Sequence, residues 1–251
     1  MGHIGSALSI ADIVAAIYFG AAQIDDVADP RRDRVVLSKG HASLAIYAAL
    51  FLRGWITRGD LDTFCGDRSR LGVHPERVLD GVDFSTGSLG HGLSLAAGAA
   101  LAARLQGSDR RVFAILSDAE CDEGSTWEAA LFAAHHQLGN LVAVVDDNGQ
   151  QALGYTDDVL ALRPLATRWR GFGWDAVDVD GHDIPELVAA MDRARLATSC
   201  PHMLVARTVF GSGVSFMERQ IKWHYLPMND EEFALAMEEV TGACAPHSYG
   251  R

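Results

Sequence analysis

Short apolar runs alternate along the chain with longer segments rich in alanine. Four runs are apolar at consecutive positions rather than at every second one, a pattern typical of strands buried on both faces. They cover residues 111–116, 141–146, 175–179 and 203–209, of which the last two are the least apolar. The alanine-rich segments predict helices over residues 10–19, 42–52, 93–105, 125–138 and 184–197. The last helix has Asp183 as its expected N-cap and Pro185 in its first turn.

The order of these elements predicts an α/β fold. Strands that alternate with helices form a mostly parallel sheet with helices on both faces. The sequence contains no internal repeat or linker, so we expect one domain over residues 1–241 and a C-terminal tail over 242–251.

Composition and charge narrow the class of protein. Hydrophobic residues make up 49% and charged residues 22%, which is ordinary for a soluble globular protein. A net charge of -12 argues against binding to nucleic acids or anionic membranes. The chain has no signal-peptide pattern and no apolar run long enough to span a membrane. Its four cysteines are widely spaced, so we expect a reduced, cytoplasmic protein.

Polar side chains follow the first two predicted strands. Asp118 comes after the first, and Asn148, thirty residues later, comes after the second. Carboxyl ends of neighbouring parallel strands meet at one edge of a sheet, where such folds bind ligands. A carboxylate and an amide oxygen suit Mg²⁺ or Ca²⁺, whose shells are often completed by diphosphate oxygens. The helix that starts near Ser125 could add its dipole. Both residues are also common in turns, so simple capping at the strand ends is the alternative.

Other phosphate and metal sites are not supported. An EF-hand loop starting at Asp118 would need Gly at its sixth position and Glu at its twelfth, where the chain has Glu123 and Ala129. The sequence has no P-loop, and the first strand–helix junction lacks the glycine pattern of a dinucleotide site.

The segment from Ser117 to Gln151, SDAECDEGSTWEAALFAAHHQLGNLVAVVDDNGQQ, resembles the thiamine-diphosphate motif of transketolases. Further motifs of that family occur in the same order, so the resemblance covers residues 2 to about 236. They are Gly2-His3-Ile4-Gly5, Leu37-Ser38-Lys39-Gly40-His41-Ala42, Gly72-Val73-His74-Pro75-Glu76, Ser85-Thr86-Gly87-Ser88-Leu89-Gly90-His91-Gly92 and Trp223-His224.

The resemblance implies the diphosphate-binding type of thiamine-diphosphate fold and a set of site residues. The metal, Mg²⁺ or Ca²⁺, would be held by Asp118, Asn148 and the backbone carbonyl of Gln150. The cofactor would contact the Ala119 N–H and the backbone of Gly87 and Leu89.

Histidines complete the site that the resemblance implies. His41 and His224 would face the diphosphate, His3 and His74 the substrate hydroxyls, with His3, His74 and His224 taking part in catalysis. A single histidine beside glycine is more often a turn or packing residue, which is the alternative for each. His91 is a weaker candidate, and His135, His136, His202 and His247 match no motif.

By resemblance, the protein transfers a two-carbon ketol unit from a ketose to an aldose with thiamine diphosphate. The length is similar to the N-terminal subunit of a split transketolase. We therefore expect activity only with a C-terminal partner that carries the pyrimidine-binding domain, in an α₂β₂ assembly acting on a sugar or sugar phosphate. The chain begins almost on the first histidine motif, so the natural start could lie upstream.

Three positions depart from the family pattern. Ser117 and Ala119 replace the two glycines that flank the motif's aspartate, and Tyr225 follows His224 where glycine is usual. Ala119 would be strained if its site required a positive φ. Ala119 and Tyr225 support the alternative of a non-catalytic scaffold or regulatory subunit. Another thiamine-diphosphate enzyme that transfers a two-carbon unit to a different acceptor is the second alternative, because most of the substrate-phosphate site would come from the partner chain.

Overall fold

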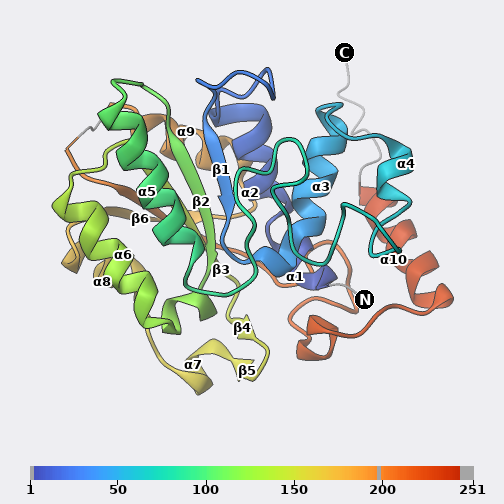
Figure 1. Ribbon diagram of the computed structural model, residues 1–251. Coiled ribbons are helices and arrows are strands. Elements are labelled where there is room, and N and C mark those ends of the chain that lie inside the picture. The colour runs from blue at the N-terminus through green and yellow to red at the C-terminus, as the bar shows by residue number, and fades with distance from the viewer. Residues whose placement is uncertain (1–2, 197–198, 244–251) are drawn as a thin grey trace, which may run out of the picture.

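Five parallel strands form the central sheet of the computed structural model, which describes residues 3–196 and 199–243 (Figure 1). Their order across the sheet is β1-β2-β3-β7-β6, and every pairing in it is parallel. The predicted fold class is therefore confirmed. The strands are β1 (Arg34–Leu37), β2 (Val112–Ser117), β3 (Leu141–Asp147), β6 (Asp175–Asp180) and β7 (His202–Arg207).

The predicted strands are all present, and the sheet contains one more. Strand β1 escaped prediction because its apolar run is only three residues long before Ser38. Strand β6 reads as weakly apolar because it is an edge strand, and its Asp175, Asp178 and Asp180 side chains are exposed.

Ten α-helices lie within the described residues, and all five predicted helices are among them. The first prediction, 10–19, corresponds to α2 and the π-helical turn η1 (Ile17–Ala21) that extends it. Asp183 caps α9 as expected, because its carboxylate accepts from the Glu186 N–H at 2.9 Å. The helices are α1 (Ile4–Ser9), α2 (Ala11–Ala16), α3 (Ser43–Leu52), α4 (Arg58–Leu61), α5 (Gly92–Leu105), α6 (Gly124–His135), α7 (Thr156–Val159), α8 (Leu165–Gly171), α9 (Ile184–Arg193) and α10 (Asp230–Ala243).

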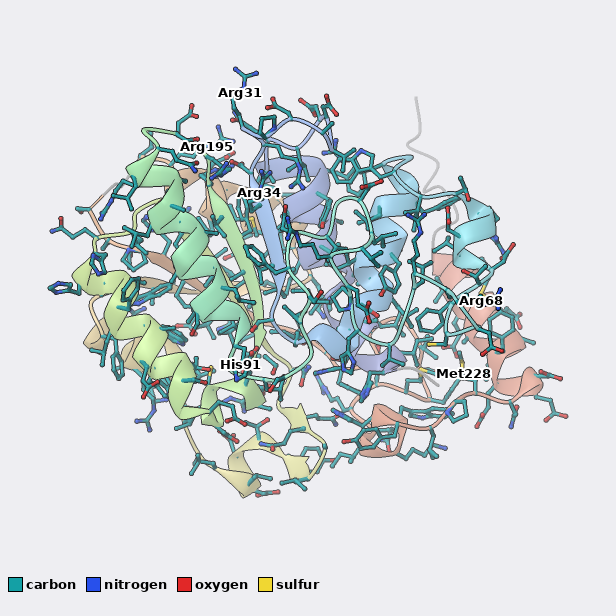
Figure 2. All side chains as sticks on the ribbon, viewed as in Figure 1. Arg31, Arg34, Arg68, His91, Arg195 and Met228 are labelled. Atoms are coloured by element: carbon teal, nitrogen blue, oxygen red, sulfur yellow. The ribbon has the colours of Figure 1, made fainter. Side chains whose placement is uncertain are left out.

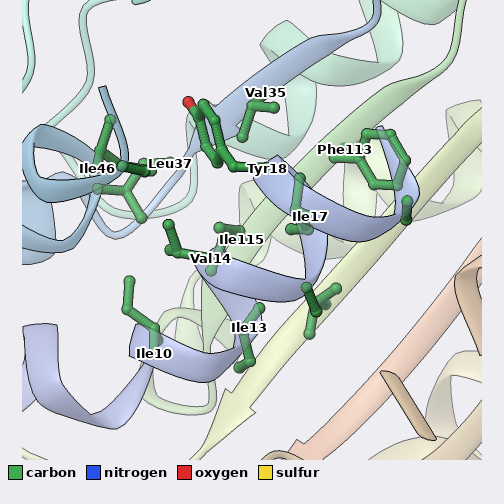
Figure 3. Close-up of a cluster of buried hydrophobic side chains, with 14 of the residues drawn as sticks. Ile10, Ile13, Val14, Ile17, Tyr18, Val35, Leu37, Ile46, Phe113 and Ile115 are labelled. Carbon is green, nitrogen blue, oxygen red and sulfur yellow. The ribbon is translucent and has the colours of Figure 1, made fainter. Parts of the chain in front are cut away.

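Side chains alternate between two apolar layers on either side of the sheet. Phe113 and Ile115 of β2 pack with α2, η1, α3 and α9, a cluster that Figure 3 shows in close-up. Val112, Ala114 and Leu116 point to the opposite face, under α5, α6 and α8. Each fully buried Val, Leu, Ile or Phe side chain among them stabilises the fold by about 1.5–3 kcal/mol. The two layers hold the strand ends in fixed positions.

The carboxyl edge of the sheet is covered by short elements. The hairpin of β4 (Gln150–Gln151) and β5 (Gly154–Tyr155) follows β3 there. Helix α1 and the short helix η4 (Ile221–His224), which lie far apart in sequence, contact each other at this edge (Figure 1).

The C-terminal end of the described chain is helical. Helix α10 continues past residue 241 to Ala243, and the rest of the predicted tail, 244–251, lies outside the described residues, as does the predicted helix end at 197. Within residues 3–196 and 199–243, no helix is long and apolar enough to cross a membrane.

Candidate functional site

Asp118 and Asn148 meet where β2 and β3 end. The two strands are neighbours, with Ser117 in register with Asp146. The Gly149 N–H, directly after Asn148, donates to Asp118 Oδ2 at 2.9 Å. Gly149 can turn the chain here because its φ is +75°, a conformation that favours glycine. The prediction that both residues emerge at one edge of the sheet is confirmed.

The Asp118 carboxylate is almost completely buried. Its side chain is 1% exposed and accepts hydrogen bonds from the N–H groups of Ala119 and Gly149 and from the Thr156 hydroxyl, each at 2.9 Å. Burial, and then the nearby Asp146 carboxylate, raise the pKa of Asp118 to about 7. A cation beside this group would favour its charged form.

A buried ion pair fixes the orientation of Asn148. Asp146, 0% exposed, accepts from Lys39 Nζ at 2.5 Å and from Ser9 Oγ at 2.6 Å. The Asn148 amide nitrogen donates to Asp146 Oδ2 at 2.8 Å, and its Oδ1 accepts from the Gln150 N–H at 2.9 Å. Because these partners define both ends of the amide, Asp146 positions the Asn148 oxygen that was predicted to bind metal.

Three of the predicted histidines form a cluster. The ring centroid of His3 lies 4.8 Å from that of His41 and 5.2 Å from that of His224. His3 stands at the start of α1, His41 in the turn after β1 and His224 in η4. The Ser6 hydroxyl hydrogen-bonds to His41 Nε2 at 3.1 Å, and Phe210 stacks on His224.

Burial keeps this cluster neutral near pH 7. Burial and the nearby Lys39 charge lower the pKa of His41 to about 2, and burial and His3 lower that of His224 to about 4. The pKa of His3 is also lowered, first by burial and then by His74. Neutral imidazoles each keep one N–H donor, and His3 Nδ1 is buried without a partner.

One cavity of about 460 Å³, here called the central cavity, collects the predicted residues. Asp118 is buried and does not line it, whereas its neighbour Ala119 and Asn148 do. Among the lining residues are His3, His41, His74, Gly87, Leu89, Ala119, Asn148, Gln150 and His224.

The remaining histidines lie elsewhere. His91 begins α5 (Figure 2) and lines a neighbouring cavity that shares His74 and Gly87 with the central one. His135, His136 and His202 do not line the central cavity, and His247 lies outside the described residues.

The three residues that depart from the family pattern have different structural effects on the site. Ala119 belongs to the short helix η3 (Ala119–Asp122) and is not among the residues with positive φ, so its methyl group causes no backbone strain. The Ser117 hydroxyl accepts from the Glu120 N–H at 3.0 Å and holds that turn. The ring centroid of Tyr225 lies 5.1 Å from that of His3 and 4.8 Å from that of His224, and Tyr225 lines the cavity.

The donor set fits a hard cation that shares its shell with a ligand. Within the part of the chain that the structure describes, no group of three or more His, Cys, Asp or Glu side chains could hold a metal. Asp118, Asn148 and the Gln150 carbonyl offer three oxygens, and Mg²⁺ in such sites takes its other oxygens from phosphates and water. These residues could therefore hold a metal whose remaining oxygens come from the phosphate groups of a ligand and from water.

Several supporting residues were not predicted. Contacts that hold the Asp118 and Asn148 side chains in place come from Ser9, Lys39, Asp146, Thr156 and Arg163. Arg163 pairs with Asp147 at 2.6 Å and lies 4.0 Å from Asp118. Lys39 and Asp146 both belong to the sequence motifs, but the motifs do not reveal their supporting role. The signal that identifies this role is the burial of Lys39, which is 1% exposed. Only the fold shows that burial.

Comparison with known proteins extends the picture given by the geometry. The family model "Transketolase, thiamine diphosphate binding domain" matches residues 1–246. A 6-deoxy-6-sulfo-D-fructose transketolase subunit, SqwG, from Clostridium sp. (strain MSTE9) is 40% identical over 243 residues, 96% of this chain and 88% of that protein. One subunit of an apulose-4-phosphate transketolase from Phocaeicola vulgatus is 36% identical over 242 residues, 96% of this chain and 86% of that protein.

Solved structures share the fold. Transketolase from Campylobacter jejuni superimposes with a TM-score of 0.83 at 27% identity, over 95% of this chain and 41% of that one. Transketolase from Pichia stipitis in complex with sedoheptulose 7-phosphate gives 0.83 at 29% identity, over 94% of this chain and 40% of that one. The chain thus spans about two fifths of the length of these longer enzymes.

Proposed function

The chain belongs to the transketolase family through its thiamine diphosphate binding domain, and on this premise we propose that it binds the metal and diphosphate end of that cofactor in a two-subunit ketol transferase. The observation that carries the proposal is the central cavity, which the histidine cluster lines together with Asn148 and Gln150 from the segment after β3. Bound there, thiamine diphosphate supplies the carbanion chemistry that breaks and forms a carbon–carbon bond next to a carbonyl.

Asp118, Asn148 and the Gln150 carbonyl would hold Mg²⁺ or Ca²⁺. The Asp118 carboxylate brings the charge, and the hydrogen bond from Asn148 to Asp146 keeps the amide oxygen aimed at the ion. The ion would draw diphosphate oxygens to the carboxyl edge of the sheet. The Ala119 N–H and the backbone of Gly87 and Leu89 are the proposed further contacts to the cofactor.

The histidines would orient phosphate and sugar oxygens. His41 and His224, neutral and largely buried, can donate N–H groups to the diphosphate without a charge to desolvate. His3 and His74 border the same cavity and would bind substrate hydroxyls. His3, His74 and His224 are the candidates for moving a proton to or from those hydroxyls.

The active enzyme would need a partner chain. Relatives matched over 88% and 86% of their own length are named as subunits. A second chain with the pyrimidine-binding domain would cover the central cavity and complete the cofactor site. We propose a heterotetramer with two copies of each chain.

The substrate would be a ketose with an anionic end. One relative is named for a sulfonated fructose and another for apulose 4-phosphate. A two-carbon transfer to another acceptor remains the rival activity. The regulatory alternative loses one of its supports, because Ala119 adopts an unstrained backbone conformation.

Calorimetric titration of thiamine diphosphate with Mg²⁺ tests the proposal, first into this chain and then into its mixture with the partner chain. We expect binding that requires the metal and tightens with the partner, followed by ketol transfer from fructose 6-phosphate or 6-deoxy-6-sulfofructose. A folded protein that binds no cofactor in either setting would refute the proposal and favour a regulatory role.

A further inference from the structure

The side chain of Gln150 is buried without a hydrogen-bond partner. It is 5% exposed, and both its Oε1 and its Nε2 lack a partner. The amide side chains on either side of it do have hydrogen-bond partners. Asn148 donates to Asp146, and Gln151 donates to Asp122 Oδ2 at 3.1 Å. Buried amides in folded proteins are nearly always hydrogen-bonded, so an orphaned carboxamide next to a site calls for a ligand.

Besides a second cavity that it shares with Arg163 and Arg207, Gln150 borders the central cavity. Gln150 lines that cavity together with Asn148 and His224. Its strand, β4, pairs with β5 and packs against η4, which carries His224. The backbone N–H of Gln150 is held by Asn148 Oδ1 at 2.9 Å, so the residue has a fixed position. The side chain is therefore presented by a rigid frame.

We propose that the Gln150 carboxamide binds the molecule in the central cavity directly, in addition to the metal contact of its backbone carbonyl. The amide can donate two N–H bonds and accept at its oxygen, which matches oxygen-rich ligands. Such oxygens come from the cofactor's diphosphate or from hydroxyls of the sugar. This inference rests on the proposed function and adds a specificity-determining side chain to it.

Gln150→Leu tests the inference, because leucine fills a similar volume and leaves the backbone carbonyl in place. Calorimetry measures the dissociation constant of thiamine diphosphate with Mg²⁺. Steady-state assays of the complex with the partner measure KM for fructose 6-phosphate. Loss of one hydrogen bond to a phosphate or hydroxyl should weaken one of these two values about tenfold. A change in the cofactor constant identifies the diphosphate as the ligand, and a change in KM alone identifies the sugar.

Thermal unfolding of the ligand-free chain separates this role from a structural one. Replacing an unpartnered buried amide by an apolar side chain should leave Tm unchanged or raise it. Asn140→Leu, at a position that does not line the central cavity, is the matched control. It removes the bonds from the amide nitrogen to the Ala100 and Arg110 carbonyls and should lower Tm, with the cofactor dissociation constant within about twofold of wild type.

Two results would overturn the inference. In both, the Gln150→Leu variant keeps its cofactor binding and its KM unchanged, either with an unchanged Tm or with a lowered Tm, which would show a purely structural role. Failure of the wild-type chain to bind cofactor would instead refute the proposed function. The two failures are thus distinguishable.

Discussion

The burial of Asp118 makes a quantitative prediction for the variant Asp118→Asn. The pKa of this carboxyl is about 7 in the folded chain against an ordinary value of 3.8. Between these two values the folded chain holds a proton that the unfolded chain has released. Stability is therefore highest below pH 4 with respect to this group, and it is lost as the pH rises through 7.

The size of the effect follows from the same two values. The difference of about three pH units between the two pKa values corresponds to about 4 kcal/mol of lost stability at pH 8, of which about 1–2 kcal/mol is already lost at pH 5. Asparagine cannot ionise, so the unfolding free energy of the variant relative to wild type should increase by about 2–3 kcal/mol from pH 5 to pH 8. For a chain of this size, that corresponds to about 4–12 °C in Tm.

Comparing the two pH values removes the part of the change in unfolding free energy that is the same at every pH. Asp118 accepts from the N–H groups of Ala119 and Gly149 and from Thr156, and an asparagine nitrogen cannot accept from these donors. That mismatch costs about 1–3 kcal/mol at every pH. Differential scanning calorimetry of ligand-free protein in a metal chelator at pH 5 and pH 8 measures the change.

Asp62→Asn, which replaces an exposed carboxylate at the end of α4, provides the background for the measurement. A difference between Asp118→Asn and wild type that stays within about 1 kcal/mol across this range would refute the reasoning. The same variant should lose Mg²⁺-dependent cofactor binding. If Asp118→Asn is more stable than wild type at pH 8 but no longer binds the cofactor, then Asp118 serves ligand binding and lowers the stability of the folded chain.

Other predictions concern the supports of the site. Ala119→Gly should lower stability by about 0.5–1 kcal/mol, because the backbone there needs no glycine, and a rise in Tm would contradict this. The pKa of His224 is lowered to about 4 from 6.5, so this residue stabilises the fold above pH 6.5 and loses that contribution as the pH falls to 4. In His224→Gln, the loss of unfolding free energy on acidification should be smaller by about 3 kcal/mol. Denaturant titrations at several pH values measure it, and an unchanged pH profile would refute the prediction. Lys39→Met leaves Asp146 buried without its cation and should cost about 3–5 kcal/mol in chemical denaturation, whereas a loss under 1 kcal/mol would argue against the ion pair.

Much of the fold could be predicted because its determinants are local. Continuous apolar runs predicted β2 and β3, and the cap at Asp183 predicted the start of α9, since strand burial and helix capping depend on near neighbours in sequence. Strand β1 was missed because its short apolar run gains its stability from pairing with β2, which no local pattern reveals.

For the site, the amino-acid sequence was enough to identify which residues carry the chemistry. The aspartate, the asparagine and the histidines stand in recognisable motifs, and the strand order that brings Asp118 beside Asn148 followed from their spacing. The physical state of these groups depends instead on the folded chain. The pKa of Asp118 is raised, those of His41 and His224 are lowered, and the Gln150 carboxamide has no hydrogen-bond partner. The burial and the charges responsible come from segments that are distant in sequence. Ser9 reaches Asp146 across 137 positions of the chain, a contact that no local pattern could contain.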